Sequence, residues 1–280
     1  MGPSAASDRR GKGELADAFS TFLWNGSEAD LRAFLAANSR LPGPRANLEL
    51  ASAFAAAVRD VGAEWRAVWT LCAGWTDTPP EDAPTNDPRE FLVFCGARGI
   101  GALGAASPAR AREALVLLRR LSRDPRWRVR EAVAMAIQDL VAGQSRPVLR
   151  DLEDWVARGA WLEMRAVAAG LAEPRILRER SVAKAALRAH ERILHWVRRS
   201  DDRSEEAFRV LRQCLGYSAS VVVAAAPEDG FRWLAKLAAT RDADVQWIVR
   251  ENLRKGRLVG PFPGPVERVQ AILRRVSSLQ

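Results

Sequence analysis

The chain contains few of the residues from which enzymes usually build acid–base or metal chemistry. Its 280 residues include two histidines, one tyrosine and three cysteines. The cysteines, Cys72, Cys95 and Cys214, are odd in number and far apart. This spacing excludes a disulfide framework and a zinc pattern, and it favours a reducing, cytoplasmic location. We therefore expect no metal ion and no cofactor.

Long uncharged runs and strand patterns are also scarce. The longest uncharged run, residues 213–227, has 15 residues, whereas a membrane helix needs about 20. Residues 1–13 are small, polar and basic without the apolar core of a signal peptide, so we expect a disordered tail there. Alternation of apolar and polar residues, which is typical of strands, does not recur. With 48% hydrophobic and 28% charged residues, the composition indicates a soluble globular protein rather than a disordered chain.

Positive charge is concentrated in the later part of the chain. Of the 43 basic residues, 39 are arginines. Residues 1–106 carry 10 basic and 13 acidic groups, whereas residues 107–280 carry 33 and 21, a net charge of +12. Such a concentration offers a candidate surface for an anionic partner.

The spacing of apolar residues is helical. Between Arg126 and Leu140 they recur at i, i+3, i+4, i+7, i+8 and i+11, which is one face of an amphipathic helix. Pro125 behind Asp124 fits the first turn after an Asp cap. A second amphipathic helix is predicted over 111–121, and the short link between them favours an antiparallel pair. Further helices are predicted over 15–23, 29–37, 47–58 and 65–75, with a loop over 76–90.

The helix pair recurs along the chain. Two of the predicted second helices begin with the same Trp-x-Val-Arg-Glu pattern, at Trp127 and at Trp247, and each follows a Ser/Thr-Arg-Asp turn. Pairs repeated about every 40 residues predict an α-solenoid. The other predicted pairs are 149–157 with 162–171, 207–215 with 218–226, and 231–239 with 245–255, and a long helix over 179–199 is inserted among them.

The turn Asp and the Val-Arg pair of the second helix resemble a HEAT-type repeat over about residues 107–258. This resemblance implies an all-α fold, namely an α-solenoid of antiparallel helix pairs in a right-handed superhelix. In that family the Asp and Arg are mostly structural, which is the alternative to a binding role for Asp124, Arg130, Asp242 and Arg250. We divide the chain into the tail 1–13, a region of degenerate capping repeats over 14–106, and a HEAT-like region with a C-terminal helix over 107–280.

Two motifs suggest chemistry that their surroundings do not favour. Gly99, Gly101 and Gly104 form a G-x-G-x-x-G pattern, but the acid that follows, Asp124, lies in a turn between helices rather than after a strand. We interpret 90–103 as a helix whose glycines permit close packing. His190 and His195 are five residues apart, about 140° around a helix, so they do not converge on one metal ion.

A third motif is a stripe of four cations spaced by four residues: Arg180, Lys184, Arg188 and Arg192. Like charges at i, i+4 repel by about 0.2–0.5 kcal/mol per pair. One interpretation is a solvated face, or a face paired with nearby acids such as Asp201, Asp202, Glu205 or Glu206. The other is an anion-binding ridge, in which phosphates relieve the repulsion.

In an α-solenoid the second helices line a concave surface, which here would carry Arg128, Arg130, Arg165 and Arg250 near the stripe. Trp127 and Trp247 are candidates for base stacking, with core packing as the alternative. We therefore hypothesise a non-catalytic scaffold with a basic concave face. Its partner is nucleic acid, with DNA favoured over RNA, or an acidic protein.

The alternative hypothesis is an enzyme. HEAT-like repeats also build DNA glycosylases that remove alkylated bases, and the chain is similar to them in size, charge and architecture. Their Trp-Trp-Asp-type motif is missing, and Trp161 with Glu163 is its nearest counterpart. Glu131, Glu163 or Glu251 could stabilise a developing sugar cation, although a helix salt bridge is the simpler explanation for each of them.

Overall fold

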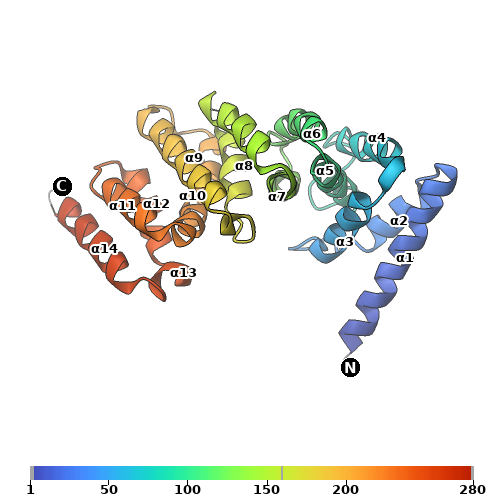
Figure 1. Cartoon of the computed structure of the whole chain (residues 1–280), viewed down its shortest axis with the longest axis horizontal. Coiled ribbons are helices and arrows are strands. Elements are labelled where there is room, and N and C mark those ends of the chain that lie inside the picture. Colours follow the sequence, from blue (N-terminus) through green and yellow to red (C-terminus); the bar gives the residue numbers. More distant parts are fainter. Residues whose placement is uncertain (1–2, 159, 279–280) are drawn as a thin grey trace. The chain divides into compact units, whose positions relative to one another are not determined.

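The computed structural model describes residues 3–158 and 160–278, and within them the chain is helical without a strand. Two compact units divide it, residues 1–144 (unit 1) and 145–280 (unit 2). The predicted all-α class is confirmed. The α-helices, labelled in Figure 1, are α1 (Pro3–Asn25), α2 (Ala29–Ala37), α3 (Leu48–Arg59), α4 (Trp65–Thr76), α5 (Glu90–Gly104), α6 (Pro108–Leu121), α7 (Trp127–Ala157), α8 (Trp161–Leu171), α9 (Arg180–Arg199), α10 (Glu206–Ala225), α11 (Pro227–Ala238), α12 (Ala243–Leu253), α13 (Gly256–Val259) and α14 (Pro263–Ser277).

The N-terminal helices lie close to where the periodicity predicts them, with α2, α3 and α4 agreeing within about a residue. The first helix differs, because α1 already begins at Pro3, inside the segment 1–13 for which we expected a disordered tail. Ala5, Ala6, Arg9 and Arg10 are good helix formers and continue the helix backwards from Leu15. Residues 1–2 of the expected tail lie outside the described residues.

Unit 1 is built around α5, every residue of which is buried. α5 packs against α3, α4 and α6, and its glycines approach the first part of α7. A Cβ on Gly101 would lie 2.6 Å from both Cα and Cβ of Ala136. The G-x-G-x-x-G pattern is therefore a packing motif inside a helix, as its sequence surroundings predict.

The boundary between the units lies at Gln144 rather than near residue 106, because α6 and the start of α7 pack on α5. α7 is labelled as one helix, but Gln144 has non-helical angles of φ −138° and ψ 52°. Pro147 follows three residues later and cannot donate to the carbonyl of Gly143, so the first segment ends there. The second segment, 145–157, starts unit 2.

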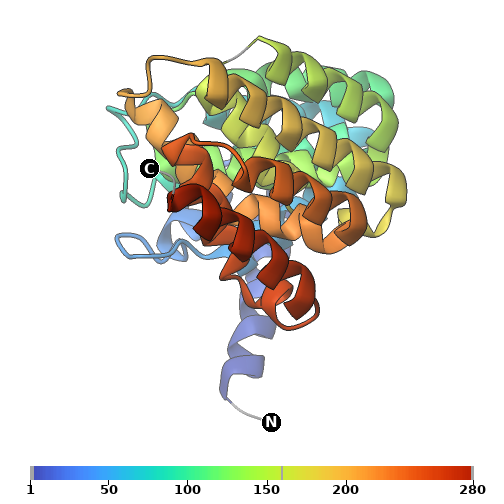
Figure 2. The same cartoon turned by 90° about the vertical axis from the view of Figure 1, so that its left-hand side faces the viewer.

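Unit 2 consists of consecutive helix hairpins that lie side by side (Figure 2). The pairs are the second segment of α7 with α8, α9 with α10, and α11 with α12. α10 lies between α8 and α12 and contacts both, while α14 covers α11. The chain is thus an α-solenoid of helix pairs, and the handedness of its superhelix stays a prediction. Among the described residues, no helix combines the length and apolar character that crossing a bilayer demands.

The predicted pair 207–215 and 218–226 is wrong, because these residues form the single helix α10. Gly216 falls between the two predicted helices, yet it lies inside α10. A Cβ there would lie 3.0 Å from the indole of Trp247, so the glycine makes room for that ring. Consequently α9 is not an insertion but the first helix of a regular pair.

The turn aspartates have the structural role that the resemblance implies. The side chain of Asp242 accepts hydrogen bonds from the backbone N–H groups of Asp244 and Val245, both at 3.0 Å. Asp124 accepts from the N–H of Arg126 at 2.8 Å. Each carboxylate therefore satisfies free N–H groups where a second helix begins.

The close packing of α5 predicts that Gly101→Ala destabilises unit 1. The new methyl group would overlap the backbone of Ala136, and such overpacking costs about 1–3 kcal/mol. Urea denaturation followed by circular dichroism measures the loss.

Gly74→Ala is the matched control, because Gly74 lies in α4 with open space where its Cβ would be. We expect this variant to be as stable as the parent or more stable, since alanine is the better helix former. Equal midpoints for the two variants would contradict the packing argument.

Candidate anion-binding surface

Helix α9 exposes the four predicted cations and buries its opposite face. Val182, Ala186, Ile193 and Val197 are among the residues packed into unit 2. Arg180, Lys184, Arg188 and Arg192, here called the α9 ridge, are all exposed. In the part of the chain that the structure describes, none of the four forms an ion pair or a side-chain hydrogen bond. The ridge is therefore positive charge without a structural partner.

The acids that could have neutralised the ridge do not pair with it. Asp202 instead accepts hydrogen bonds from the backbone and hydroxyl of Ser204 at 3.1 and 2.7 Å, and these bonds lower the pKa of Asp202. The predicted pairing with residues 201–206 is thus not formed. Pairing with these acids is therefore ruled out, and the stripe is either a solvated face or an anion-binding ridge.

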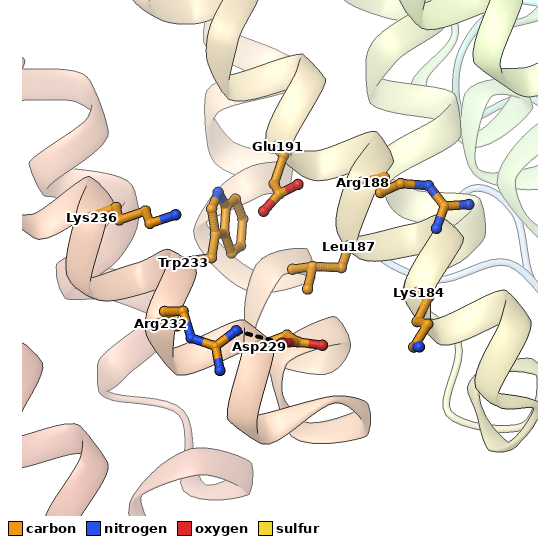
Figure 3. Close-up of a pocket in the computed structure, with 8 residues that line it drawn as sticks. All are labelled: Lys184, Leu187, Arg188, Glu191, Asp229, Arg232, Trp233 and Lys236. Atoms are coloured by element: carbon orange, nitrogen blue, oxygen red, sulfur yellow. Dashed lines mark hydrogen bonds and ion pairs between the residues drawn. The ribbon is translucent and has the colours of Figure 1, made fainter.

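A groove of about 280 Å³ lies between α9 and α11 (Figure 3). Four cations and two carboxylates line it. Asp229 pairs with Arg232 at 2.8 Å, and Figure 3 shows Lys236 and Glu191 near the indole of Trp233. The α9–α11 groove is formed by Lys184, Leu187, Arg188, Glu191, Asp229, Arg232, Trp233 and Lys236.

The floor of this groove is neutral. Trp233 is buried and meets the ring of His190 edge to face, with centroids 6.4 Å apart. His190 donates from Nδ1 to the carbonyl of Ala186 at 2.9 Å, and its Nε2 accepts from the hydroxyl of Ser218 at 3.0 Å. Burial lowers the pKa of His190 to about 4, so the imidazole is uncharged near neutrality.

A second groove, of about 370 Å³, lies on the other side of α9, against the second segment of α7. Arg188 lines both grooves, whereas Arg192 lines only this one and Lys184 only the first. Residues four apart are offset by about 40° around a helix, so the ridge turns gradually from one groove towards the other. The residues of this α7–α9 groove are Glu153, Val156, Arg188, Ala189, Glu191 and Arg192.

The excess positive charge of the chain belongs to unit 2. Residues 145–280 contain 25 basic and 17 acidic residues, whereas residues 1–144 contain 18 and 17. The ridge therefore lies in the unit whose net charge favours an anion.

The second helices do not supply the cations expected of them. Arg128 is only 4% exposed and donates to Glu90 at 3.2 Å and to the carbonyl of Gly43 at 2.6 Å. Arg130 donates to the carbonyls of Asp124 and Pro125 at 2.7 and 2.9 Å. Because burial of a guanidinium requires such partners, these arginines hold unit 1 together.

The two remaining second-helix candidates differ from each other. Arg165 is 6% exposed, so it does not present its charge to solvent. Arg250 is exposed, donates to Gln246 at 2.8 Å and lines a separate groove with residues of α14, including Arg274. Only Arg250 of these four candidates therefore retains an exposed side chain.

The predicted stacking residues are likewise divided. Trp127 is 45% exposed, with the guanidinium of Arg128 at 4.5 Å from its ring centroid. Trp247 is half-buried, because Arg212 covers its ring at 3.8 Å and α10 packs against it at Gly216. Trp247 therefore fills space between helices, as the core-packing alternative predicts.

The residues considered for catalysis are occupied by packing. Trp161 stacks edge to face on Phe208 at 5.4 Å, and Glu163 is fully buried. Glu251 pairs with Arg254 at 2.9 Å, and Glu131 is half-buried and has a partner of its own. His190 is buried whereas His195 is exposed, in agreement with the predicted divergence of their rings. No observation therefore favours a glycosylase site.

Sequence reasoning missed the contribution of α11. Arg232 and Lys236 are themselves four residues apart, and they face Lys184 and Arg188 across the α9–α11 groove. The spacing of these two cations could have indicated their role. The sequence did not show that α9 and α11 border one groove, since this arrangement depends on α10 being one unbroken helix.

Comparisons with known proteins give no family for the chain. No protein-family model and no curated protein matches it. An engineered protein of known structure matches with a TM-score of 0.35 and 15% identity, over 94% of this chain and 97% of its own. A designed armadillo repeat protein matches with a TM-score of 0.30 and 16% identity, over 78% and 96%.

The burial of Arg128 predicts that Arg128→Met destabilises the chain strongly. The substitution leaves Glu90 buried without its charge partner, which typically costs about 3–5 kcal/mol. The double variant Arg128→Met with Glu90→Gln should recover much of the loss, because it removes the unpaired charge. Urea denaturation measures both variants, and a fully stable single variant would contradict the role of the ion pair.

Burial of His190 predicts a loss of stability on acidification. Its pKa is about 4 in the folded chain and about 6.5 in the unfolded chain, so between these values only the unfolded state binds the proton. Stability should fall by about 3 kcal/mol as pH drops from 6.5 to 4. In His190→Gln this part of the pH dependence should disappear, whereas it should persist in His195→Gln, which changes the exposed histidine. Denaturation midpoints across pH 4–7 provide the measurement.

Proposed function

We propose that this chain is a non-catalytic helical-repeat scaffold that binds the phosphate backbone of nucleic acid along the α9 ridge and the α9–α11 groove. One observation carries the proposal. The ridge cations are exposed and without partners among the described residues, whereas the arginines of the second helices are mostly buried or bonded to the backbone.

Electrostatic repulsion along α9 supports this assignment. Three i, i+4 contacts between like charges cost on the order of 1 kcal/mol in total. Within the described part of the chain, none of these four residues forms an ion pair that would offset the repulsion. A row of phosphates would relieve the repulsion and release counterions, and guanidinium groups bind phosphate through two hydrogen bonds.

The length of the ridge suits a repeated charge. From Arg180 to Arg192 the helix rises by about 18 Å, at 1.5 Å per residue. One strand of B-form DNA covers that length with about five nucleotides, at 3.4 Å each. Across the groove, Lys236 adds one further cation, whereas Arg232 is paired with Asp229 and Glu228.

This regularity favours nucleic acid over an acidic protein as the partner. Evenly spaced cations on one helix fit a polymer whose charge repeats along its whole length, whereas a protein partner would need a matching row of carboxylates. The net charge of unit 2 would also steer a polyanion towards the ridge. DNA is the first partner to test, with RNA of the same sequence beside it.

The proposal predicts that the triple variant Lys184→Glu, Arg188→Glu and Arg192→Glu loses binding to DNA. Fluorescence anisotropy with labelled duplex and single-stranded DNA, titrated at several salt concentrations, measures it. Each phosphate contact contributes about −0.9 to the slope of log K against log salt on duplex DNA. The parent should therefore show a slope near −3 or steeper, and the variant should lose most of it.

A matched control changes the net charge equally at another place. Arg257→Glu, Arg268→Glu and Arg275→Glu alter three exposed cations of α13 and α14, and this variant should keep most of the affinity. Circular dichroism verifies that both variants fold. Equal losses would show that overall charge, not the ridge, attracts DNA. Binding of polyglutamate but not of DNA or RNA would favour the acidic-protein partner and overturn the proposal.

A further inference from the structure

The row of cations on α9 ends in an exposed tryptophan. Trp196 occupies the next position in the same spacing, four residues after Arg192, and it is 37% exposed. A large aromatic side chain at the surface loses the benefit of burial. The neighbouring apolar residues of α9 are buried, because Ile193, Leu194 and Val197 pack inside unit 2. Trp196 is therefore the apolar residue in a row of positions that otherwise carries cations.

Cations flank this indole along the helix. Arg192 precedes it by four residues and Arg199 follows it by three, and both are exposed. Residues three and four apart on a helix have Cβ atoms about 5–6 Å apart. A phosphate held by Arg192 or Arg199 would therefore place the base of the same or the next nucleotide within reach of the indole face.

We propose that Trp196 is a stacking platform for an unpaired base, so that α9 prefers single-stranded nucleic acid, or a single-stranded end, to an uninterrupted duplex. This inference rests on the proposed function of the ridge. A base can stack on an aromatic side chain only when its own face is free, whereas in a duplex the faces are covered by neighbouring base pairs. Every base has such a face, so the platform is tolerant of sequence.

The other tryptophans near the ridge are unsuited to this role. Trp233 forms the buried floor of the α9–α11 groove against His190. Trp247 is covered on one face by Arg212. Trp196 combines exposure with a place in the row of cations.

The experiment compares single-stranded DNA with a duplex of the same sequence, using the full chain and Trp196→Ala. We expect Trp196→Ala to bind the single strand about fivefold more weakly or worse, since the lower end of the stacking energy on one aromatic residue corresponds to about this factor. Binding of the duplex should change less than about twofold, because its bases do not reach the indole. Trp196→Phe should keep most of the affinity for the single strand, since it retains an aromatic face.

Trp24→Ala is the matched control. Trp24 is 86% exposed but lies in α1, in unit 1, away from the ridge in the sequence. Its removal should leave both affinities unchanged. Thermal unfolding of each variant establishes that the remaining chain is folded.

The outcomes separate the two proposals. If the parent binds neither form of DNA, the proposed function fails and the platform fails with it. If reversal of the ridge charges abolishes binding while Trp196→Ala leaves the preference for single strands unchanged, only the platform is overturned. Equal weakening on both forms would also overturn it, and so would a change in oligomeric state of Trp196→Ala on gel filtration, which would assign the indole to self-association.

Discussion

A guanidinium group that leaves water must find a carboxylate or a carbonyl oxygen, and this requirement sorts the arginines of the chain. Arg126 is the clearest example, because its guanidinium is almost fully buried and donates to Asp124 and to the carbonyls of Thr78 and Ala83. Those bonds tie the loop before α5 to the start of α7. Arg98 pairs with Asp139 at 2.8 Å inside the same unit. Arginines of this kind specify how helices and loops meet.

The same requirement explains why most of the arginines predicted on the second helices are not exposed. Second helices begin next to turns that expose carbonyl groups, so an arginine in their first turns finds partners at once, as Arg130 does. Among the described residues, the outer face of α9 offers no such partners to its four cations. These cations stay in solvent, so the uncompensated charge lies on the α9 ridge.

Much of the fold could be predicted because it depends on local periodicity. The amphipathic pattern predicted α2–α4 and the buried helix at Glu90, and the turn aspartates predicted where α7 and α12 begin. Prediction failed where a contact between distant residues decided the outcome. Gly216 lies inside α10, where Trp247, which follows it by 31 positions in the sequence, occupies the space that a side chain would need. No local rule distinguishes such a glycine from one in a turn.

The candidate site also contains features that local periodicity predicts and features that depend on distant contacts. The α9 ridge was visible as a spacing, since exposure on a helix follows from periodicity alone. The burial of Arg128 and Arg165 was not, because it depends on distant segments, namely the loops at Gly43 and Asn86 for Arg128 and the packing of α8 on α10 for Arg165.

Stability and binding are connected in α9 through its two faces. The buried apolar residues hold the helix in unit 2, while the ridge opposes helix formation through repulsion of like charges. Burial of the apolar face outweighs this repulsion, so α9 stays folded while the repulsion is confined to its outer face. Under the proposed function, an anion bound there would remove this repulsion without rearranging the core. Binding would then stabilise α9, and a more stable α9 would hold its cations in place for binding.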